Sequence, residues 1–161
     1  MFWRVFENLL FLFYDLLAYL FLVIYVYMSK KILFVEDDEG FYNIFSVPLK
    51  MKGYDVLRVS DGSSAVDKVI VEKPDLVLLD IVLPGTSGLD VLKELREREE
   101  TKSVFVVMLT NFGNDENISK AMEYGANDYL MKYNIVPSEL PDKIASFLGE
   151  DPNFNIKVTE L

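Results

Sequence analysis

Several apolar runs of this chain end in residues that can do chemistry. The acidic stretch from Glu36 to Glu39 follows the first run, Asp80 and Thr110 follow two others, and a further run leads through Tyr129 to Lys132. Singly, acids and Thr often cap helices, and a lone Lys is usually solvated. Together, carboxylates brought close repel one another unless a cation holds them, and hard oxygen ligands suit Mg²⁺.

The chemistry that this set predicts is phosphoryl transfer to a carboxylate. An ionised Asp80 beside Mg²⁺ is a competent nucleophile toward a phosphoryl group. Lys132 and the hydroxyl of Thr110 can stabilise charge on the phosphoryl oxygens. The cofactor predicted by these side chains is therefore Mg²⁺.

The elements that must position these residues alternate between strands and helices. Short apolar runs predict strands at 32–35, 55–59, 76–79, 104–109 and 128–130. Mixed stretches predict helices at 39–52, 63–72, 88–99, 114–124 and 137–148, with Pro48 expected to kink the first or shift its boundaries. This alternation predicts an α/β fold with a doubly wound, five-stranded parallel sheet in a (βα)5 series. Ligands of such sheets bind at the carboxyl ends of the strands, where the reactive residues gather.

The N-terminal segment differs in character from the rest of the chain. Residues 9–28 are apolar or aromatic except for Asp15, and twenty such residues can span a bilayer as a helix. Lys30 and Lys31 follow directly, so the positive-inside bias places the following domain in the cytoplasm. We therefore predict a hydrophobic helix in residues 1–28 as a candidate membrane anchor, a domain in residues 29–149 tethered to the inner face of the plasma membrane, and a short polar tail in residues 150–161.

Two other interpretations of the N-terminal segment stay open. It could be a buried or partner-binding helix, although its apolar residues cover every face. Alternatively, Met28 is the true start and the preceding residues are mis-assigned. Deleting residues 1–27 removes one basic and two acidic residues and changes the net charge only from −10 to −9, so charge does not separate these readings.

Composition excludes several function classes. A net charge of −10 disfavours binding to nucleic acid, whose phosphates need a basic face. The absence of Cys excludes disulfides and thiolate nucleophiles, and the absence of His excludes Ser-His-Asp catalysis and an internal phosphohistidine. The chain therefore cannot be its own phosphohistidine donor, and a signal must arrive and leave through other proteins.

Two motifs resemble the receiver domain of two-component response regulators. The segment from Lys31 to Asp38 resembles the first strand of that family with its acidic pair, and the segment from Asp80 to Gly88 resembles its phosphoacceptor loop. The spacing of the family also holds, because Thr110 lies 30 residues after Asp80 and Lys132 lies three residues after Tyr129. The resemblance covers residues 31 to about 149 and implies a flavodoxin-like fold.

The resemblance implies a role for each acidic residue. Asp80 would accept a phosphoryl group from a sensor histidine kinase or a phosphotransfer protein. Asp37 would bind Mg²⁺ directly and Glu36 would act through a metal-bound water, with Asp38 as the main alternative ligand. Asp80 itself and the backbone carbonyl of Val82 would complete the protein's ligands.

The resemblance also implies how phosphorylation is read. Lys132 would pair with the phosphoryl oxygens, Thr110 would move toward them, and Tyr129 would change rotamer, altering a surface that binds a downstream protein target. Such a stand-alone receiver in a phosphorelay catalyses its own phosphorylation and slow dephosphorylation and is not a turnover enzyme.

Three departures from the family pattern bear on these roles. Asn111 stands where the family commonly has Ala or Ser. Tyr133 replaces the Pro that usually follows the Lys, and a cis bond before a non-proline residue costs about 2.5–4 kcal/mol, so we expect a trans bond and some displacement of Lys132. Val82 and Phe112 are apolar where the family often orients a hydrolytic water, which predicts slow autodephosphorylation. The alternative function is a pseudo-receiver, a protein-interaction module that phosphorylation does not regulate.

Overall fold

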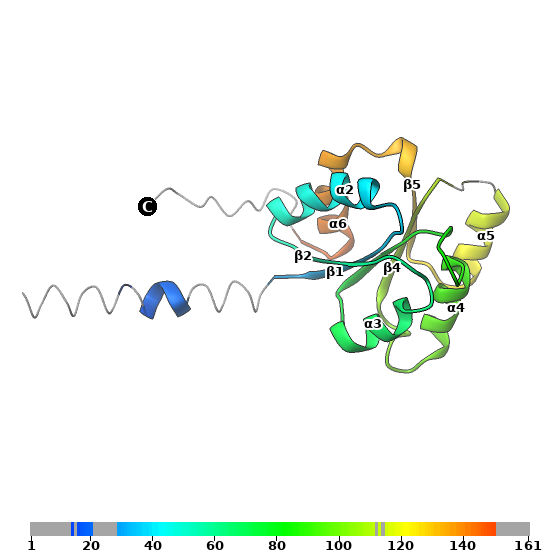
Figure 1. The fold of residues 1–161 in the computed structure, drawn as a ribbon, viewed down its shortest axis with the longest axis horizontal. Coiled ribbons are helices and arrows are strands. Elements are labelled where there is room, and N and C mark those ends of the chain that lie inside the picture. Colours follow the sequence, from blue (N-terminus) through cyan, green and yellow to red (C-terminus); the bar gives the residue numbers. More distant parts are fainter. Residues whose placement is uncertain (1–13, 15, 21–28, 112, 114, 151–161) are drawn as a thin grey trace, which may run out of the picture.

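Five parallel strands form one sheet at the centre of the molecule (Figure 1). The computed structural model describes residues 14, 16–20, 29–111, 113 and 115–150. The strands are β1 (Lys31–Val35), β2 (Asp55–Val59), β3 (Leu76–Leu79), β4 (Phe105–Thr110) and β5 (Asp128–Met131), in the order β2-β1-β3-β4-β5.

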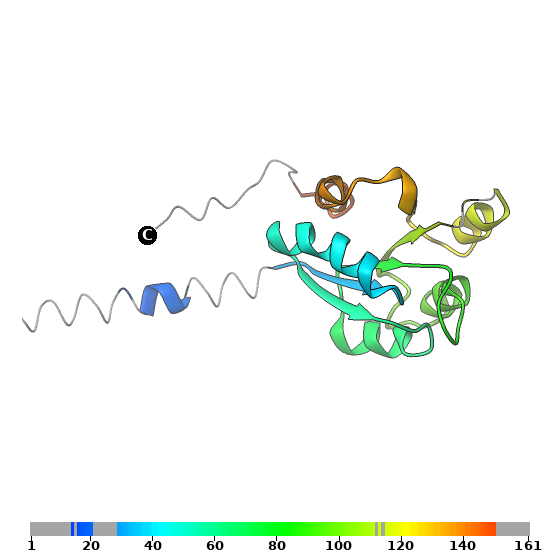
Figure 2. The same ribbon diagram turned by 45° about the horizontal axis from the view of Figure 1, so that its top comes forward.

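Helices cover both faces of this sheet (Figures 1 and 2). They are α2 (Glu39–Met51), α3 (Ala65–Glu72), α4 (Gly88–Glu97), α5 (Asp115–Glu123) and α6 (Leu140–Phe147), with short 3₁₀ helices η1 (Lys132–Asn134) and η2 (Pro137–Glu139) before α6. Helices α2 and α6 lie on one face, and α3, α4 and α5 lie on the other. The predicted flavodoxin-like, doubly wound (βα)5 fold is confirmed.

The core consists of two apolar layers, one on each side of the sheet. In β1, Leu33 and Val35 face the α3–α4–α5 layer, whereas Ile32 and Phe34 face the α2–α6 layer. All four residues of β3 are completely buried, which explains why the strands carry no polar alternation. Truncating one such side chain, as in Leu78→Ala, is expected to cost about 2–5 kcal/mol of stability.

The strand register aligns the ends of the strands. Val35 of β1 pairs with Leu79 of β3, so Glu36 and Asp80 leave the sheet at the same level. On the other side, Thr110 pairs with Met131, and Lys132 follows directly. Residues far apart in the sequence therefore meet at one edge.

The predicted boundaries differ from the structure at several helix and strand ends, mostly by one or two residues. Helix α2 continues through Pro48 to Met51, so the shifted boundary is wrong, and the alternative of a kink stays a prediction. Leu49, directly after Pro48, is completely buried. Strand β4 includes Thr110 instead of ending before it, because Thr110 pairs with β5. The last predicted helix divides into η2 and α6, and η1 was not predicted at all.

The N-terminal prediction mostly falls on residues outside the described ranges. Residue 14 and residues 16–20 are helical, and their neighbours in the predicted helix of residues 1–28 are not described. Within the part of the chain that the structure describes, no helix has the length and apolar character needed to cross a membrane. The anchor stays a prediction, and residues 151–161 of the tail also lie outside the description.

Candidate functional site

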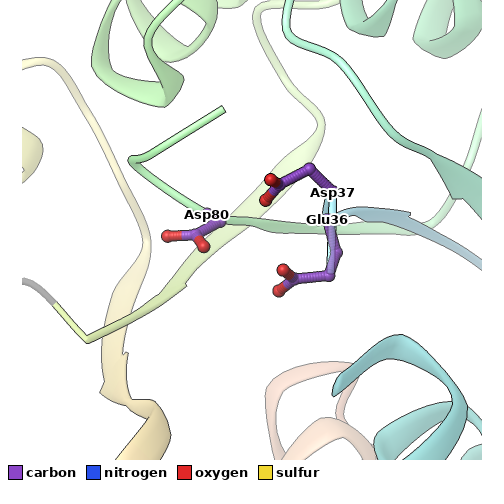
Figure 3. Close-up of side chains that lie close together, drawn as sticks. All are labelled: Glu36, Asp37 and Asp80. Atoms are coloured by element: carbon purple, nitrogen blue, oxygen red, sulfur yellow. The ribbon is translucent and has the colours of Figure 1, made fainter. Parts of the chain in front are cut away.

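Three carboxylates gather at the carboxyl edge of the sheet. Glu36 and Asp37 follow β1 and Asp80 follows β3, and one oxygen from each lies within 4.8 Å of the others. Figure 3 shows the three side chains turned toward a common space. Glu36 is completely buried, Asp80 is 6% exposed, and Asp37 is exposed to solvent. The site is therefore open on the side of Asp37 and closed on the side of Glu36.

One ammonium group bridges two of these carboxylates. The Nζ of Lys132 lies 2.6 Å from Oδ2 of Asp80 and 2.5 Å from Oε2 of Glu36, and the Lys132 side chain is only 7% exposed. The ring of Phe41, in the first turn of α2, lies 4.2 Å from the same nitrogen. Lys132 is thus held by two acids and an aromatic face.

Burial and charge shift the pKa values of this pair. Burial raises the pKa of Glu36 above 4.5, and the hydrogen bond and charge of Lys132 offset only part of that effect. For Lys132 burial acts to lower the pKa, but the hydrogen bonds and charges of Asp80 and Glu36 outweigh it and raise the pKa above 10.5. Lys132 therefore stays protonated at neutral pH.

The donor set fits a hard divalent cation. Three carboxylates and one ammonium leave an excess of negative charge in a partly buried space, which a cation would relieve. The buried Oε2 of Glu36 is ion-paired with Lys132 yet accepts no hydrogen bond of normal geometry. The three carboxylates offer oxygen atoms as metal ligands, and Mg²⁺ prefers oxygen ligands.

Asp38 has a different role from its two acidic neighbours. Its Oδ1 accepts a hydrogen bond of 2.9 Å from the backbone N–H of Phe41, which caps the N-terminus of α2. Its own N–H donates to Oε1 of Glu36 at 3.1 Å. Asp38, the alternative ligand, is thus outside the group of three carboxylates and acts as a helix cap.

Thr110 and Tyr129 lie on the β4–β5 side of the site. Thr110 is completely buried at the end of β4. Tyr129, in β5, is half-buried, and its pKa is raised to about 12, mainly by burial and next by the negative charge of Asp80. Tyr129 therefore lies within electrostatic reach of Asp80; the switching roles of both residues stay predictions.

The structure describes most of the residues that depart from the family pattern. The peptide bond between Lys132 and Tyr133 is trans, as predicted, and Tyr133 is 69% exposed. Lys132 nevertheless reaches Asp80, because η1 begins at Lys132 and turns the chain directly after β5. Asn111 is exposed, Val82 is 50% exposed and donates its N–H to Oδ1 of Asp80 at 3.3 Å, and Phe112 lies outside the described residues.

Two glycines shape the loops around Asp80. A Cβ on Gly88 would lie 1.9 Å from the carbonyl oxygen of Asp80, so only Gly permits α4 to begin this close to Asp80. A Cβ on Gly62 would lie 1.9 Å from the carbonyl oxygen of Thr86, so the loop after β2 packs directly on the loop after β3. Neither glycine could be assigned a role from the sequence, because such close approaches depend on tertiary contacts.

The comparisons with known proteins agree with this geometry. The family model described as response regulator receiver domain matches residues 32–145. The alkaline phosphatase synthesis transcriptional regulatory protein PhoP of Bacillus subtilis is 40% identical over 124 residues, which are 75% of this chain and 49% of that protein. This chain spans about half the length of the curated relatives it matches.

Solved structures are similar over the same region. A response regulator from Chloroflexus aurantiacus is 31% identical, with a TM-score of 0.69, and the match covers 76% of this chain and 99% of that one. The receiver domain of the sensor histidine kinase PA1611 from Pseudomonas aeruginosa is 29% identical, with a TM-score of 0.68, and covers 76% and 99% of the two chains. The latter structure contains a magnesium ion coordinated in its active-site cleft.

Proposed function

Because this chain belongs to the response regulator receiver domain family, we propose that it is a phosphoacceptor whose Asp80 takes a phosphoryl group in a Mg²⁺-dependent reaction. The observation that carries this proposal is the position of the Asp80 carboxylate. It lies 2.6 Å from the ammonium of Lys132 and within 4.8 Å of the carboxylates of Glu36 and Asp37. One carboxylate thus contacts a cation and lies close to two potential metal ligands, one of which, Glu36, contacts the same cation.

The transfer would proceed by attack of an Asp80 carboxylate oxygen on phosphorus. A new P–O bond forms as the bond from phosphorus to the donor breaks, and the electron pair of that bond leaves with the donor. Lys132 is close enough to follow the phosphoryl oxygens without a large movement, since its Nζ already contacts Asp80. Mg²⁺, when bound, would supply positive charge that offsets the acidic cluster and the incoming phosphoryl group.

The metal would be held by residues of this chain that meet in one place. Glu36, Asp37 and Asp80 supply carboxylate oxygens. The backbone carbonyl of Val82, in the loop that follows Asp80, is the further proposed ligand. The magnesium ion in the active-site cleft of the PA1611 receiver domain supports, by similarity, a magnesium site in this chain.

The composition of the chain indicates which partners the proposed reaction needs. These 161 residues contain no His and so supply no phosphohistidine, and the proposed donor is a sensor histidine kinase or a phosphotransfer protein. The output would be a protein target rather than nucleic acid, given the net charge of −10. Attachment to the inner face of the membrane through residues 9–28 is part of the same proposal, and fractionation of cells expressing the full chain tests it.

The phosphorylation test is intact-mass measurement after incubation with Mg²⁺ and acetyl phosphate. The wild-type chain should gain one phosphoryl group, and Asp80→Asn should gain none. Asp90→Asn, which changes an exposed Asp at the start of α4, is the matched control and should behave as wild type. A wild-type chain without an Asp80-dependent adduct would refute the proposal and favour the pseudo-receiver, an interaction module that phosphorylation does not regulate.

A further inference from the structure

A single arginine contacts the backbone of both acidic residues that follow β1. Arg58 lies in β2, directly beside Phe34 in the register of β1. Its Nε donates to the carbonyl oxygen of Glu36 at 3.1 Å, and its Nη2 donates to the carbonyl oxygen of Asp37 at 2.7 Å. One guanidinium thus spans two consecutive peptide groups at the point where the chain leaves the sheet.

The guanidinium is itself held in place. Its Cζ lies 5.3 Å from the ring centroid of Tyr42 in α2, within the range of a cation–π contact. The hydroxyl of Tyr42 donates to the carbonyl oxygen of Val56 at 3.4 Å, which links the ring to the same strand as Arg58. Arg58 is therefore fixed between α2 and β2.

The two peptide groups need such a restraint because the chain changes direction there. Strand β1 ends at Val35, residue 37 is a bend, and α2 begins at Glu39. The side chains of Glu36 and Asp37 point into the same space although they are neighbours in sequence. The directions of these two side chains depend on the orientation of the two peptide groups. The N–H donors of a guanidinium have a rigid geometry, so one guanidinium can hold both peptide groups at once.

We propose that Arg58 is a positioning residue for the divalent cation, which sets the geometry of the Glu36–Asp37 pair by binding their carbonyl oxygens. This inference rests on the proposed Mg²⁺ site. It adds a residue outside the acidic cluster, on the edge strand of the sheet, whose role is to orient ligands without touching the metal. Outer groups that orient metal ligands typically change metal affinity by 10- to 100-fold when removed.

The decisive variant is Arg58→Lys, which keeps the charge but cannot reproduce the fork. Calorimetric titration with MgCl₂ should show a dissociation constant raised on the order of tenfold. The rate of phosphorylation by acetyl phosphate should fall most at low Mg²⁺ and recover part of the loss as Mg²⁺ is raised, since Asp80 and Lys132 are unchanged.

The matched control is Arg96→Lys. Arg96 also uses a fork to hold a loop, donating to the carbonyl oxygen of Gly125 at 2.9 Å and to Oδ1 of Asn127 at 3.1 Å, but it lies in α4 and does not contact the acidic pair. It should lose stability without losing Mg²⁺ affinity. Wild-type affinity in Arg58→Lys, or an equal loss in both variants, would overturn the inference.

The two proposals fail in different ways. A wild-type chain that binds Mg²⁺ but takes no phosphoryl group would refute the phosphoacceptor and leave the role of Arg58 to be decided by the titrations. A chain that is phosphorylated, with Arg58→Lys binding Mg²⁺ as wild type does, would refute only the role of Arg58.

Discussion

The Nζ of Lys132 lies 2.6 Å from Oδ2 of Asp80, although 52 residues separate them in the chain. The same nitrogen lies 2.5 Å from Oε2 of Glu36, and all three side chains are at most 8% exposed. Breaking a buried ion pair by removing one partner costs more than the pair contributes, because the remaining charge is left without compensation. The structure therefore makes Lys132 a counter-ion for the site before any phosphoryl group arrives.

Lys132→Met should lower the free energy of unfolding without Mg²⁺ by about 3–5 kcal/mol at neutral pH, because it leaves two buried carboxylates facing each other. Adding Mg²⁺ should restore part of the loss by replacing the missing positive charge. Urea unfolding with and without MgCl₂ measures both effects. Lys120→Met, which breaks an exposed pair with Glu116 in α5, is the control and should cost no more than about 1 kcal/mol. Equal losses in the two variants would contradict the role of Lys132.

Phe41→Leu should slow phosphorylation of Asp80 by about fivefold, because a cation–π contact worth roughly 1 kcal/mol no longer holds Lys132. Phe41→Tyr keeps the ring face and should retain the wild-type rate. The measurement is the rate of adduct formation with acetyl phosphate at saturating Mg²⁺.

The control for Phe41 is its stacking neighbour Phe45, whose ring centroid lies 4.2 Å away and which is 5% exposed. Phe45→Leu should lose more stability than Phe41→Leu, since it is more deeply buried, but should keep the wild-type rate. If Phe45→Leu slowed phosphorylation more than Phe41→Leu, the two rings would affect the rate only through the stability of the fold.

The fold could be predicted because its strongest signals are local. Strands β2 and β3 were predicted with their observed boundaries, since short, mostly apolar runs bounded by turn residues mark strands. The gathering of Glu36, Asp37, Asp80 and Lys132 at one edge also followed from the strand ends. Sequence reasoning did not find Arg58, Phe41, Gly62 or Gly88, because each acts through a contact with a distant segment that no spacing rule encodes. The boundary shift expected at Pro48 was wrong, since α2 runs through Pro48 to Met51 and Leu49 beyond it is completely buried.

Asp61→Asn should make stability less dependent on pH on the acid side. Hydrogen bonds from Ser63 and Ser64 lower the pKa of Asp61 below 3.8 in the folded chain, just before α3 begins. A lowered pKa means that this stabilisation is present above 3.8 and is lost as the pH falls through the folded-state value. The free energy of unfolding of wild type should therefore exceed that of Asp61→Asn at neutral pH, by less than about 1 kcal/mol because the carboxylate is so exposed. In strong acid the two free energies should converge.

The measurement for Asp61 is urea unfolding from neutral pH to well below pH 3.8. Asp55→Asn, at an exposed position in β2, is the control for the loss of one surface carboxylate. A constant difference between wild type and Asp61→Asn at every pH would show that the substitution acts through packing and not through the ionised carboxylate.

Val82→Asn should speed loss of the phosphoryl group from Asp80. Val82 lies two residues after Asp80, the proposed acceptor, its side chain is 50% exposed, and its N–H already donates to Oδ1 of Asp80 at 3.3 Å. An apolar side chain there cannot orient a water for attack on phosphorus, so the phosphorylated wild type should be long-lived. An amide at the same position can hold such a water, and we expect the decay rate to rise by about tenfold or more.

The measurement for Val82 is the half-life of the adduct after removal of acetyl phosphate. Val82→Leu and the distant, exposed Val71→Asn are controls that should decay as wild type does. A wild-type half-life of only seconds would contradict the prediction, since it would mean that water reaches the phosphoryl group in the right orientation without help from this position.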